Sequence, residues 1–201
     1  MEFGQDSNYA LLLDMVRRRN PISRVQLAEE FGLSKVTVST IINELIDEGL
    51  IIEVGEGTGC EKGGRKPILL ALNASHKYAV GVDIGTTNTV AAIGNLRGEV
   101  VVKSQQPTAK DRSSNNIFKE VSQLSGDIIE SSNIGRNSIL GVGLSVPGVV
   151  EALEGVIRIS PVLNWDNVEV NDNLAEWIGL AVVSDNCCRA MLVGAGWHGK
   201  A

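Results

Sequence analysis

The sequence predicts an α/β protein in two parts, a winged helix-turn-helix over residues 1–75 and an α/β domain over residues 76–201. Two observations predict this fold class. In the first part, three stretches with helical apolar spacing precede two short β-like runs around a glycine-rich segment, which is the element order of a winged helix. From Tyr78 onward, β-like and helix-like patterns alternate, which is typical of an α/β domain.

The helices of the first part have recognisable start and stop signals. Ser23 and Ser34 are suited to cap the second and third helices, because serine side chains accept hydrogen bonds from a helix N-terminus. Gly32 is suited to end the second helix, and Asn20 with Pro21 to end the first. The predicted helices span residues 9–19, 24–31 and 35–48, and the predicted strands of the wing span residues 50–54 and 68–72.

The second part begins with a predicted hairpin around a turn at residues 85–88 and continues with alternating strands and helices. The predicted strands span residues 78–84, 89–95, 100–104, 139–145, 156–159 and 181–184. The predicted helices span residues 115–131, 174–178 and 188 onward.

Charge and cysteine content narrow the class of protein. The net charge is −6, and residues 1–78 hold nine Lys and Arg against eleven Asp and Glu, so any DNA-binding face must come from local clustering of cations. No apolar run approaches the ~20 residues that cross a bilayer, and no secretory signal is recognisable. The three cysteines lack metal-ligand spacing, so we expect reduced thiols in a cytoplasmic protein that contacts no membrane.

A helix-turn-helix places a small residue on its first helix, a glycine in the turn and two apolar residues on its second helix. Ala28, Gly32, Val38 and Ile41 stand at suitable spacing for this packing. The third helix exposes short hydrogen-bonding side chains and one cation, which suit base edges and phosphates of the major groove. Two cations end the glycine-rich wing and suit phosphate or minor-groove contact. The predicted DNA-binding residues are Ser34, Lys35, Thr37, Ser39, Thr40, Asn43, Arg65 and Lys66.

A second motif lies where the first strand of the α/β domain ends. An aspartate is followed by a Gly/Thr turn, which can direct backbone N–H groups at a phosphate. The candidate residues of this phosphate-loop-like turn are Asp83, Gly85, Thr86 and Thr87.

Taken together, these motifs resemble the ROK family (repressors, open reading frames and sugar kinases), and in particular its winged-helix repressor branch. The resemblance covers essentially the whole chain. It is carried by residues 21–24 (PISR), 32–34 (GLS), 37–39 (TVS), 63–67 (GGRKP), 81–85 (GVDIG), 141–148 (GVGLSVPG), 160–165 (SPVLNW) and 185–201.

The resemblance implies that the second domain is an incomplete actin-like (ribonuclease H-like) ATPase lobe, ending after the first lobe of a sugar-kinase-like domain. It implies a homo-oligomer on palindromic operator DNA and a sugar effector, xylose or another aldose. It places the zinc site of the family beyond residue 201, together with further sugar ligands and the adenosine-binding lobe. We therefore expect no catalytic residue, no metal and no cofactor in this chain, and a degenerate sugar sensor.

The sugar kinases of the family carry an Asn-Asp pair that two alignments place differently here. One puts the catalytic aspartate at Asp185; the other, which matches more positions without a gap, puts the family asparagine at Asn186 and the aspartate at Cys187. With Asn164, the resemblance then gives the candidate sugar-binding residues Asn164, Asn186 and Cys187. The leading hypothesis is a sugar-responsive repressor of sugar-utilisation genes. The alternatives are a sugar kinase that uses Asp185 as base and a non-functional gene fragment.

Overall fold

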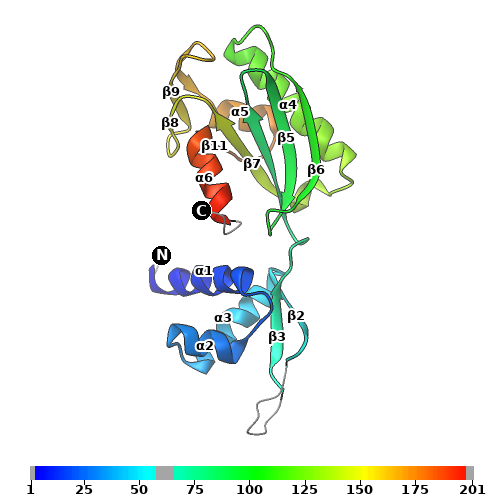
Figure 1. The fold of residues 1–201 in the computed structure, drawn as a ribbon, viewed down its shortest axis with the longest axis vertical. Helices are drawn as coiled ribbons and strands as arrows, with labels where there is room; N and C mark the ends of the chain where they lie inside the picture. The colour runs from blue at the N-terminus through cyan, green and yellow to red at the C-terminus, as the bar shows by residue number, and fades with distance from the viewer. Residues whose placement is uncertain (1–2, 58–65, 198–201) are drawn as a thin grey trace. The chain divides into compact units, whose positions relative to one another are not determined.

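The structure, a computed structural model, describes residues 3–57 and 66–197. The chain divides into two compact units, Met1–His76 and Lys77–Ala201 (Figure 1). Each unit has its own hydrophobic core.

The first unit has the winged helix-turn-helix fold predicted from the sequence. Its strands form a small antiparallel sheet in the order β1-β3-β2. The strand β1 was not predicted, because two residues carry no readable apolar alternation. The elements in chain order are α1 (Phe3–Arg18), β1 (Ile22–Ser23), α2 (Arg24–Phe31), α3 (Lys35–Asp47), β2 (Ile51–Glu56) and β3 (Ile68–Leu72).

The ends of α2 and α3 follow from local side-chain chemistry. Ser23 accepts a hydrogen bond from the Gln26 backbone N–H, and the Gln26 side chain accepts one from the Ser23 backbone N–H, which completes a capping box. Gly32 ends α2 in the left-handed conformation, with φ of 64°. Ser34 caps α3 through the Thr37 N–H. The two predicted caps and the predicted glycine stop are therefore confirmed.

The crossing of α2 and α3 is packed as the helix-turn-helix spacing predicted. Ala28 on α2 is buried, and Val38 and Ile41 on α3 are buried against it in one core with Leu12 of α1 and Leu70 of β3. Burial of one face leaves the opposite face of α3 exposed, which is the face that carries the predicted DNA contacts.

The second unit is built on a five-stranded mixed sheet in the order β11-β7-β4-β5-β6. β4 runs parallel to β7, and β7 parallel to β11, whereas β5 and β6 are antiparallel to their neighbours. A second antiparallel sheet has the order β10-β9-β8. The strands are β4 (Tyr78–Ile84), β5 (Asn88–Asn95), β6 (Val100–Pro107), β7 (Ile139–Val146), β8 (Val149–Glu151), β9 (Val156–Ser160), β10 (Trp165–Glu169) and β11 (Val182–Asn186).

Two helices, α4 (Ser114–Ser131) and α5 (Asn171–Ile178), bury their apolar faces in the core of this unit. The ring of Phe118 on α4 meets that of Trp165 edge to face, with centroids 5.8 Å apart. A short 3₁₀ helix, Arg136–Ser138, precedes β7. None of the helices in the described ranges is both long and apolar enough to span a membrane.

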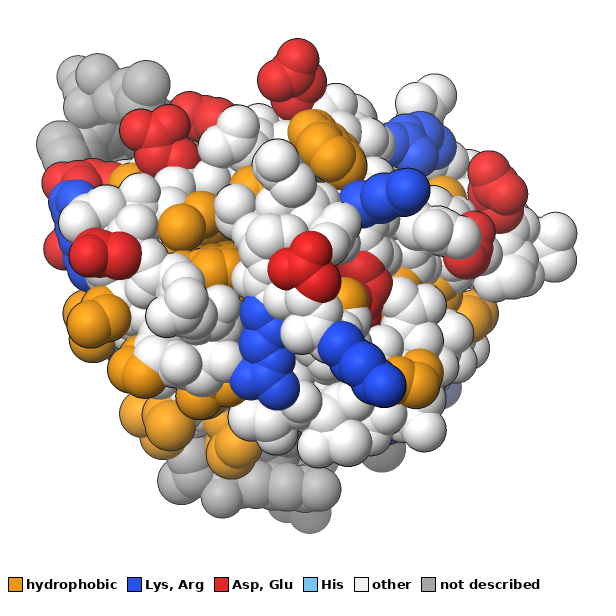
Figure 2. Space-filling view, turned by 90° about the horizontal axis from the view of Figure 1, so that it is seen from above, with side chains coloured by type: hydrophobic (Ala, Val, Ile, Leu, Met, Phe, Trp, Pro, Cys, Tyr) orange, Lys and Arg blue, Asp and Glu red, His pale blue; other side chains and the backbone are white. Residues whose placement is uncertain are grey.

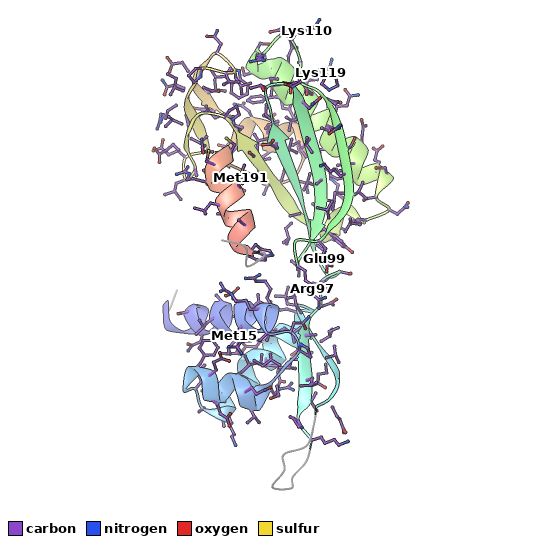
Figure 3. All side chains as sticks on the ribbon, viewed as in Figure 1. Met15, Arg97, Glu99, Lys110, Lys119 and Met191 are labelled. Atoms are coloured by element: carbon purple, nitrogen blue, oxygen red, sulfur yellow. The ribbon has the colours of Figure 1, made fainter. Side chains whose placement is uncertain are left out.

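The last helix, α6 (Cys187–Trp197), differs from the other α-helices because none of its described residues is buried. Met191, labelled in Figure 3, is 74% exposed, and Leu192 and Val193 are each 66% exposed. An apolar helix therefore stands uncovered next to β7 and β11 in the part of the chain that the structure describes.

Candidate nucleic-acid interface and ligand site

The DNA-binding residues predicted on the third helix lie together along the N-terminal half of α3. Lys35 opens the helix and Asn43 is the last of the group. Lys35, Thr40 and Asn43 are exposed, as is the capping residue Ser34, whereas Thr37 and Ser39 are half-buried. The acids of this helix, Glu44 and Asp47, follow in its C-terminal half, so the half that carries the predicted contacts is free of acidic side chains.

Several of these polar side chains are already hydrogen-bonded within the unit. The hydroxyl oxygens of Ser34 and Thr37 lie 2.8 Å apart, and the Thr40 hydroxyl donates to the Val36 carbonyl oxygen at 3.1 Å. The Asn43 carboxamide oxygen accepts from Arg24 at 3.2 Å. These hydroxyls and this amide can still accept or donate one further bond, but fewer groups are free than the sequence suggests.

The cations of the first unit are mostly paired with acids. Arg17 and Arg18 both contact Asp14, Arg19 contacts Glu30, and Arg24 contacts Glu53. Among the described residues of this unit, Lys35 is the one cation without an acidic side chain in salt-bridge range. Positive charge at the base of α3 therefore comes from Lys35 and from the N-terminus of the helix itself.

The wing is described in part. Lys66, which precedes β3, is exposed, and its Nζ lies 3.9 Å from a Glu56 oxygen on β2. Such an exposed pair contributes little stability and leaves the ammonium free to meet a phosphate. The predicted contact Arg65 lies outside the described residues.

Figure 2 shows a face of the second unit, on which Lys and Arg side chains are interspersed with Asp and Glu, so the charge of that face is mixed.

In the second unit, three polar residues stand side by side at the carboxyl ends of the parallel strands. Asp83 on β4 and Asp185 on β11 both pair in register with Ser145, which lies on β7 between them. The Ser145 hydroxyl donates to the Asp83 carboxylate at 2.5 Å. Carboxyl ends of parallel strands commonly form ligand sites, because loops open there. Sequence reasoning missed Ser145, which lies within the GVGLSVPG segment but carries no signal of its own.

The turn after β4 is fixed by hydrogen bonds to its backbone carbonyl oxygens. The carbonyl oxygens of Gly85 and Thr87 accept from the Thr108 hydroxyl and the Thr108 N–H, each at 2.9 Å, and that of Thr86 accepts from Arg112 at 3.1 Å. A Cβ at Gly85 would lie 2.6 Å from the Asn88 carbonyl oxygen, so this position requires glycine. Within the described residues, the N–H groups of Thr86 and Thr87 have no acceptor, as an anion-binding turn requires.

Asn186 and Cys187 lie where β11 passes into α6. The Asn186 side chain donates to the Gly148 carbonyl oxygen at 2.6 Å and accepts from the Cys188 N–H at 2.8 Å. Burial raises the pKa of the Cys187 thiol, and Cys188 and the Asp83 carboxylate add to the rise. Cys187 is therefore a protonated thiol at neutral pH, not an anionic base.

Asp185, the alternative catalytic base, is engaged by its neighbours. Its Oδ1 accepts from Arg189 Nε and from the Asn186 N–H, each at 2.6 Å, and Arg189 Nη2 lies 2.5 Å away. Arg189 also donates to the Val150 carbonyl oxygen at 2.9 Å, which fixes the guanidinium in place. Arg189 and the Asn186 N–H thus hold the Asp185 carboxylate through one of its two oxygens.

Asn164 lies apart from this junction, in a left-handed conformation with φ of 57°. It lines a polar groove of about 700 Å³. The other lining residues are 110–114, 163, 165, 166 and 168. Lys110, labelled in Figure 3, stands at this groove near the start of α4. Asn186 and Cys187 do not line the groove, so the described contacts do not bring the three predicted sugar-binding residues together.

Arg112 organises this groove, and the sequence analysis did not identify it. Its guanidinium donates to the Val162 carbonyl oxygen and to that of Thr86, and its own carbonyl oxygen accepts from the Trp165 indole at 2.6 Å. It thereby joins the turn after β4 to the segment before β10. These partners are 26, 50 and 53 residues away in sequence, so no local pattern could have indicated them.

A winged helix with an exposed polar helix, followed by a sheet of this order with a glycine turn after its first strand, defines a two-domain protein of the sugar-kinase-like class. The chain belongs to the ROK family. The ROK family model matches residues 79–201, and the MarR family model matches residues 4–59.

The relatives include the xylose repressor of Caldicellulosiruptor bescii, 30% identical over 193 residues that cover 96% of this chain and 48% of the relative. The xylose repressor of Bacillus subtilis is 28% identical over 200 residues, covering 99% of this chain and 51% of that protein. A solved ROK family transcriptional regulator, described as a homologue of the E. coli Mlc protein, shares the fold with a TM-score of 0.77. It is 20% identical, and the match covers 95% of this chain and 48% of that one. The chain therefore spans about half the length of the relatives it matches.

Proposed function

We propose that this chain is the DNA-binding part, with the first lobe of the sensor, of a sugar-responsive transcriptional repressor. Operator DNA is contacted by the N-terminal half of α3 and by the wing. The observation that carries the proposal is the acid-free, exposed half of α3 with Lys35 unpaired at its start, within a winged helix whose relatives are named repressors. The protein acts as a homo-oligomer on two half-sites.

The effector is an aldose, and xylose is the first candidate because two relatives are named xylose repressors. We assign its contacts to Asn164 in the groove of about 700 Å³. Asn186 and Cys187, at the start of α6, do not line that groove, so their contact with the same sugar is a separate proposal. A groove of this size accepts a monosaccharide. Sugar binding shifts the second unit between two states, alters the spacing of the two DNA-binding helices, and changes operator affinity by about 1–3 kcal/mol.

The same geometry disfavours a sugar kinase. Arg189 pairs with the Asp185 carboxylate and, with the Asn186 N–H, occupies its Oδ1, and the Cys187 thiol keeps its proton because its pKa is raised. A general base needs a free lone pair within reach of the sugar hydroxyl. We therefore assign the free N–H groups of the Gly85–Thr87 turn to holding an anionic group without phosphoryl transfer.

The test is selection of a binding site by the full 201-residue chain from a randomised duplex library, followed by fluorescence anisotropy across a salt series. We expect a palindromic consensus and an affinity that falls steeply with salt, because phosphate contacts release counterions. Failure to enrich any sequence at low salt would rule out the proposal.

The effector is tested on the selected duplex with xylose, glucose and N-acetylglucosamine. One sugar should shift the binding curve, and Asn164→Ala should abolish that shift without changing affinity for DNA in the absence of sugar. Coupled measurement of ADP release with the same sugars addresses the kinase alternative. Turnover that is lost in Asp185→Asn would replace the repressor assignment with an enzyme.

A further inference from the structure

One apolar side chain on the DNA-facing helix has no structural role in the unit. Val36, the second residue of α3, is 76% exposed, which makes it the most exposed large apolar side chain among the described residues of the first unit. Val36 is not among the residues predicted from the sequence to contact DNA, because all of those are polar or charged. It lies in the first turn, directly after Lys35 and two residues after the capping residue Ser34.

This valine is unfavourable for the isolated protein. A β-branched side chain lowers helix propensity relative to alanine, since its χ1 rotamers are restricted against the preceding turn. Burial normally offsets that cost, but Val36 is left in solvent. An exposed valine that packs on nothing in its own unit is therefore suited to pack on a partner.

The polar side chains around Val36 are largely engaged with each other. Ser34 and Thr37 share a hydrogen bond, and the Thr40 hydroxyl, one turn further on, donates to the backbone carbonyl oxygen of Val36 itself. Asn43 is bonded to Arg24. The exposed side chains of the first turn that have no hydrogen-bond or ion-pair partner in the described unit are those of Lys35 and Val36, one cationic and one apolar.

We propose that Val36 is a specificity-determining residue that packs against the C5-methyl group of a thymine in the major groove. The inference rests on the proposed function, because it requires α3 to lie in the groove. Thymine presents the one apolar group among the base edges of the major groove. Every other edge is polar, and covering it with valine leaves a donor or acceptor without a partner.

The chemistry predicts a half-site with a thymine opposite the N-terminal turn of α3. Lys35 lies beside it and donates to the O6 and N7 of a neighbouring guanine or to a phosphate. Deoxyuridine differs from thymidine only by lacking the C5-methyl group. Replacing thymine by uracil therefore removes the proposed contact and leaves base pairing and the hydrogen-bonding edge unchanged.

The experiment uses the full chain and the duplex selected from the randomised library. Each thymine is replaced in turn by deoxyuridine, and the affinities of wild type, Val36→Ala and Val100→Ala are measured by anisotropy. Val100 is the matched control, an exposed valine (62%) on β6 of the second unit. Alanine favours helix, so Val36→Ala keeps α3 folded, which circular dichroism verifies.

We expect deoxyuridine at one position of each half-site to weaken wild-type binding about fourfold, the effect of one methyl group removed from a contact. Val36→Ala should bind the thymine duplex more weakly by a similar factor and be insensitive to deoxyuridine at that position. Val100→Ala should behave as wild type. The inference is overturned, while the proposed function stands, if no deoxyuridine substitution changes the affinity of wild type. It is also overturned if the substitutions weaken binding of Val36→Ala as much as binding of wild type. A chain that enriches no duplex overturns the proposed function, and this inference with it.

Discussion

The Arg24 guanidinium joins α3 to the wing through Asn43 and Glu53. Its Nη2 donates to the Asn43 carboxamide oxygen at 3.2 Å, and its Nη1 to the Glu53 carboxylate at 2.9 Å. One residue of α2 therefore contacts both α3 and β2 at the proposed interface. The Glu53 carboxylate is a negative charge close to the proposed phosphate path, and it neutralises Arg24 there.

Glu53→Gln should increase DNA affinity. The amide keeps a hydrogen-bond acceptor for Arg24 but removes the charge that repels phosphates, so we expect roughly three- to tenfold tighter binding and a steeper salt dependence. Anisotropy with the selected duplex measures both. Glu151→Gln in the second unit is the control and should change neither. Unchanged affinity in Glu53→Gln would place β2 away from the DNA.

Lys35→Gln should weaken binding to every sequence by a similar factor and lower the salt slope by about 0.9, the value of one phosphate contact. The reason is that the other described cations of the first unit have acidic partners, whereas Lys35 has none. The slope of log affinity against log salt is the measurement, with Lys103→Gln on β6 as control. If Lys35→Gln changes only the preferred base and leaves the slope intact, Lys35 contacts a base edge.

The sequence predicted the elements that have strong periodicity and clear end signals. The bounds of α2, β3 and β4 agree with the structure residue for residue, because capping serines, glycines and alternating valines mark them. The strands β8 and β10 were missed. Both belong to the small sheet and alternate weakly, and in β10 Asn167 takes a positive φ of 49° inside the strand. Helix α1 begins at Phe3, six residues before the predicted start at Tyr9.

The candidate site residues also fall into those that a local sequence pattern indicates and those that it does not. The predicted DNA contacts at α3 all lie within ten consecutive residues, 34–43, so a local pattern indicated them. Arg112 and Ser145 act through partners on other strands and loops, which only the folded sheet brings near. Val36 was missed for a different reason, since an apolar residue on a helix is ordinarily assigned to a core. Its exposure becomes evident only when the packing of α2 against α3 is known.

Tyr9 should make the first unit less stable at alkaline pH. Burial raises the pKa of the Tyr9 phenol, and its hydrogen bond to the Glu48 carboxylate raises it further. In the unfolded chain the phenol loses its proton near pH 10, whereas the folded unit keeps it. The stabilisation from this bond is therefore complete below about pH 10 and is lost as the pH rises above that value.

Thermal unfolding followed by far-UV circular dichroism at about pH 9 and pH 11 measures this effect. Wild type should lose more stability between the two values than Tyr9→Phe, which has no phenol to ionise. Tyr78→Phe in the second unit is the matched control and should respond like wild type. Equal losses in Tyr9→Phe and wild type would show that the Tyr9–Glu48 bond does not couple the ionisation to folding.

Gly148→Ala should destabilise the second unit, because the backbone at this position excludes a side chain. Gly148 has φ of 145°, and a Cβ there would lie 2.5 Å from the Ile159 carbonyl oxygen and 3.0 Å from the Ser160 Cβ. The Gly148 carbonyl oxygen also accepts the hydrogen bond from Asn186 that anchors the start of α6. Moving this backbone therefore disturbs β8, β9 and the junction of β11 with α6 together. We expect a loss of at least about 2 kcal/mol.

Urea denaturation followed by tryptophan fluorescence measures this loss selectively, since all three tryptophans of the chain lie in the second unit. Gly81→Ala is the matched control. Gly81 lies on β4, and no atom comes within 4 Å of a Cβ built there, so its effect should stay within about 0.5 kcal/mol. If Gly148→Ala unfolds at the same urea concentration as wild type, the loop before β8 tolerates a side chain. Asn186 would then hold its position at the start of α6 without a fixed Gly148 carbonyl.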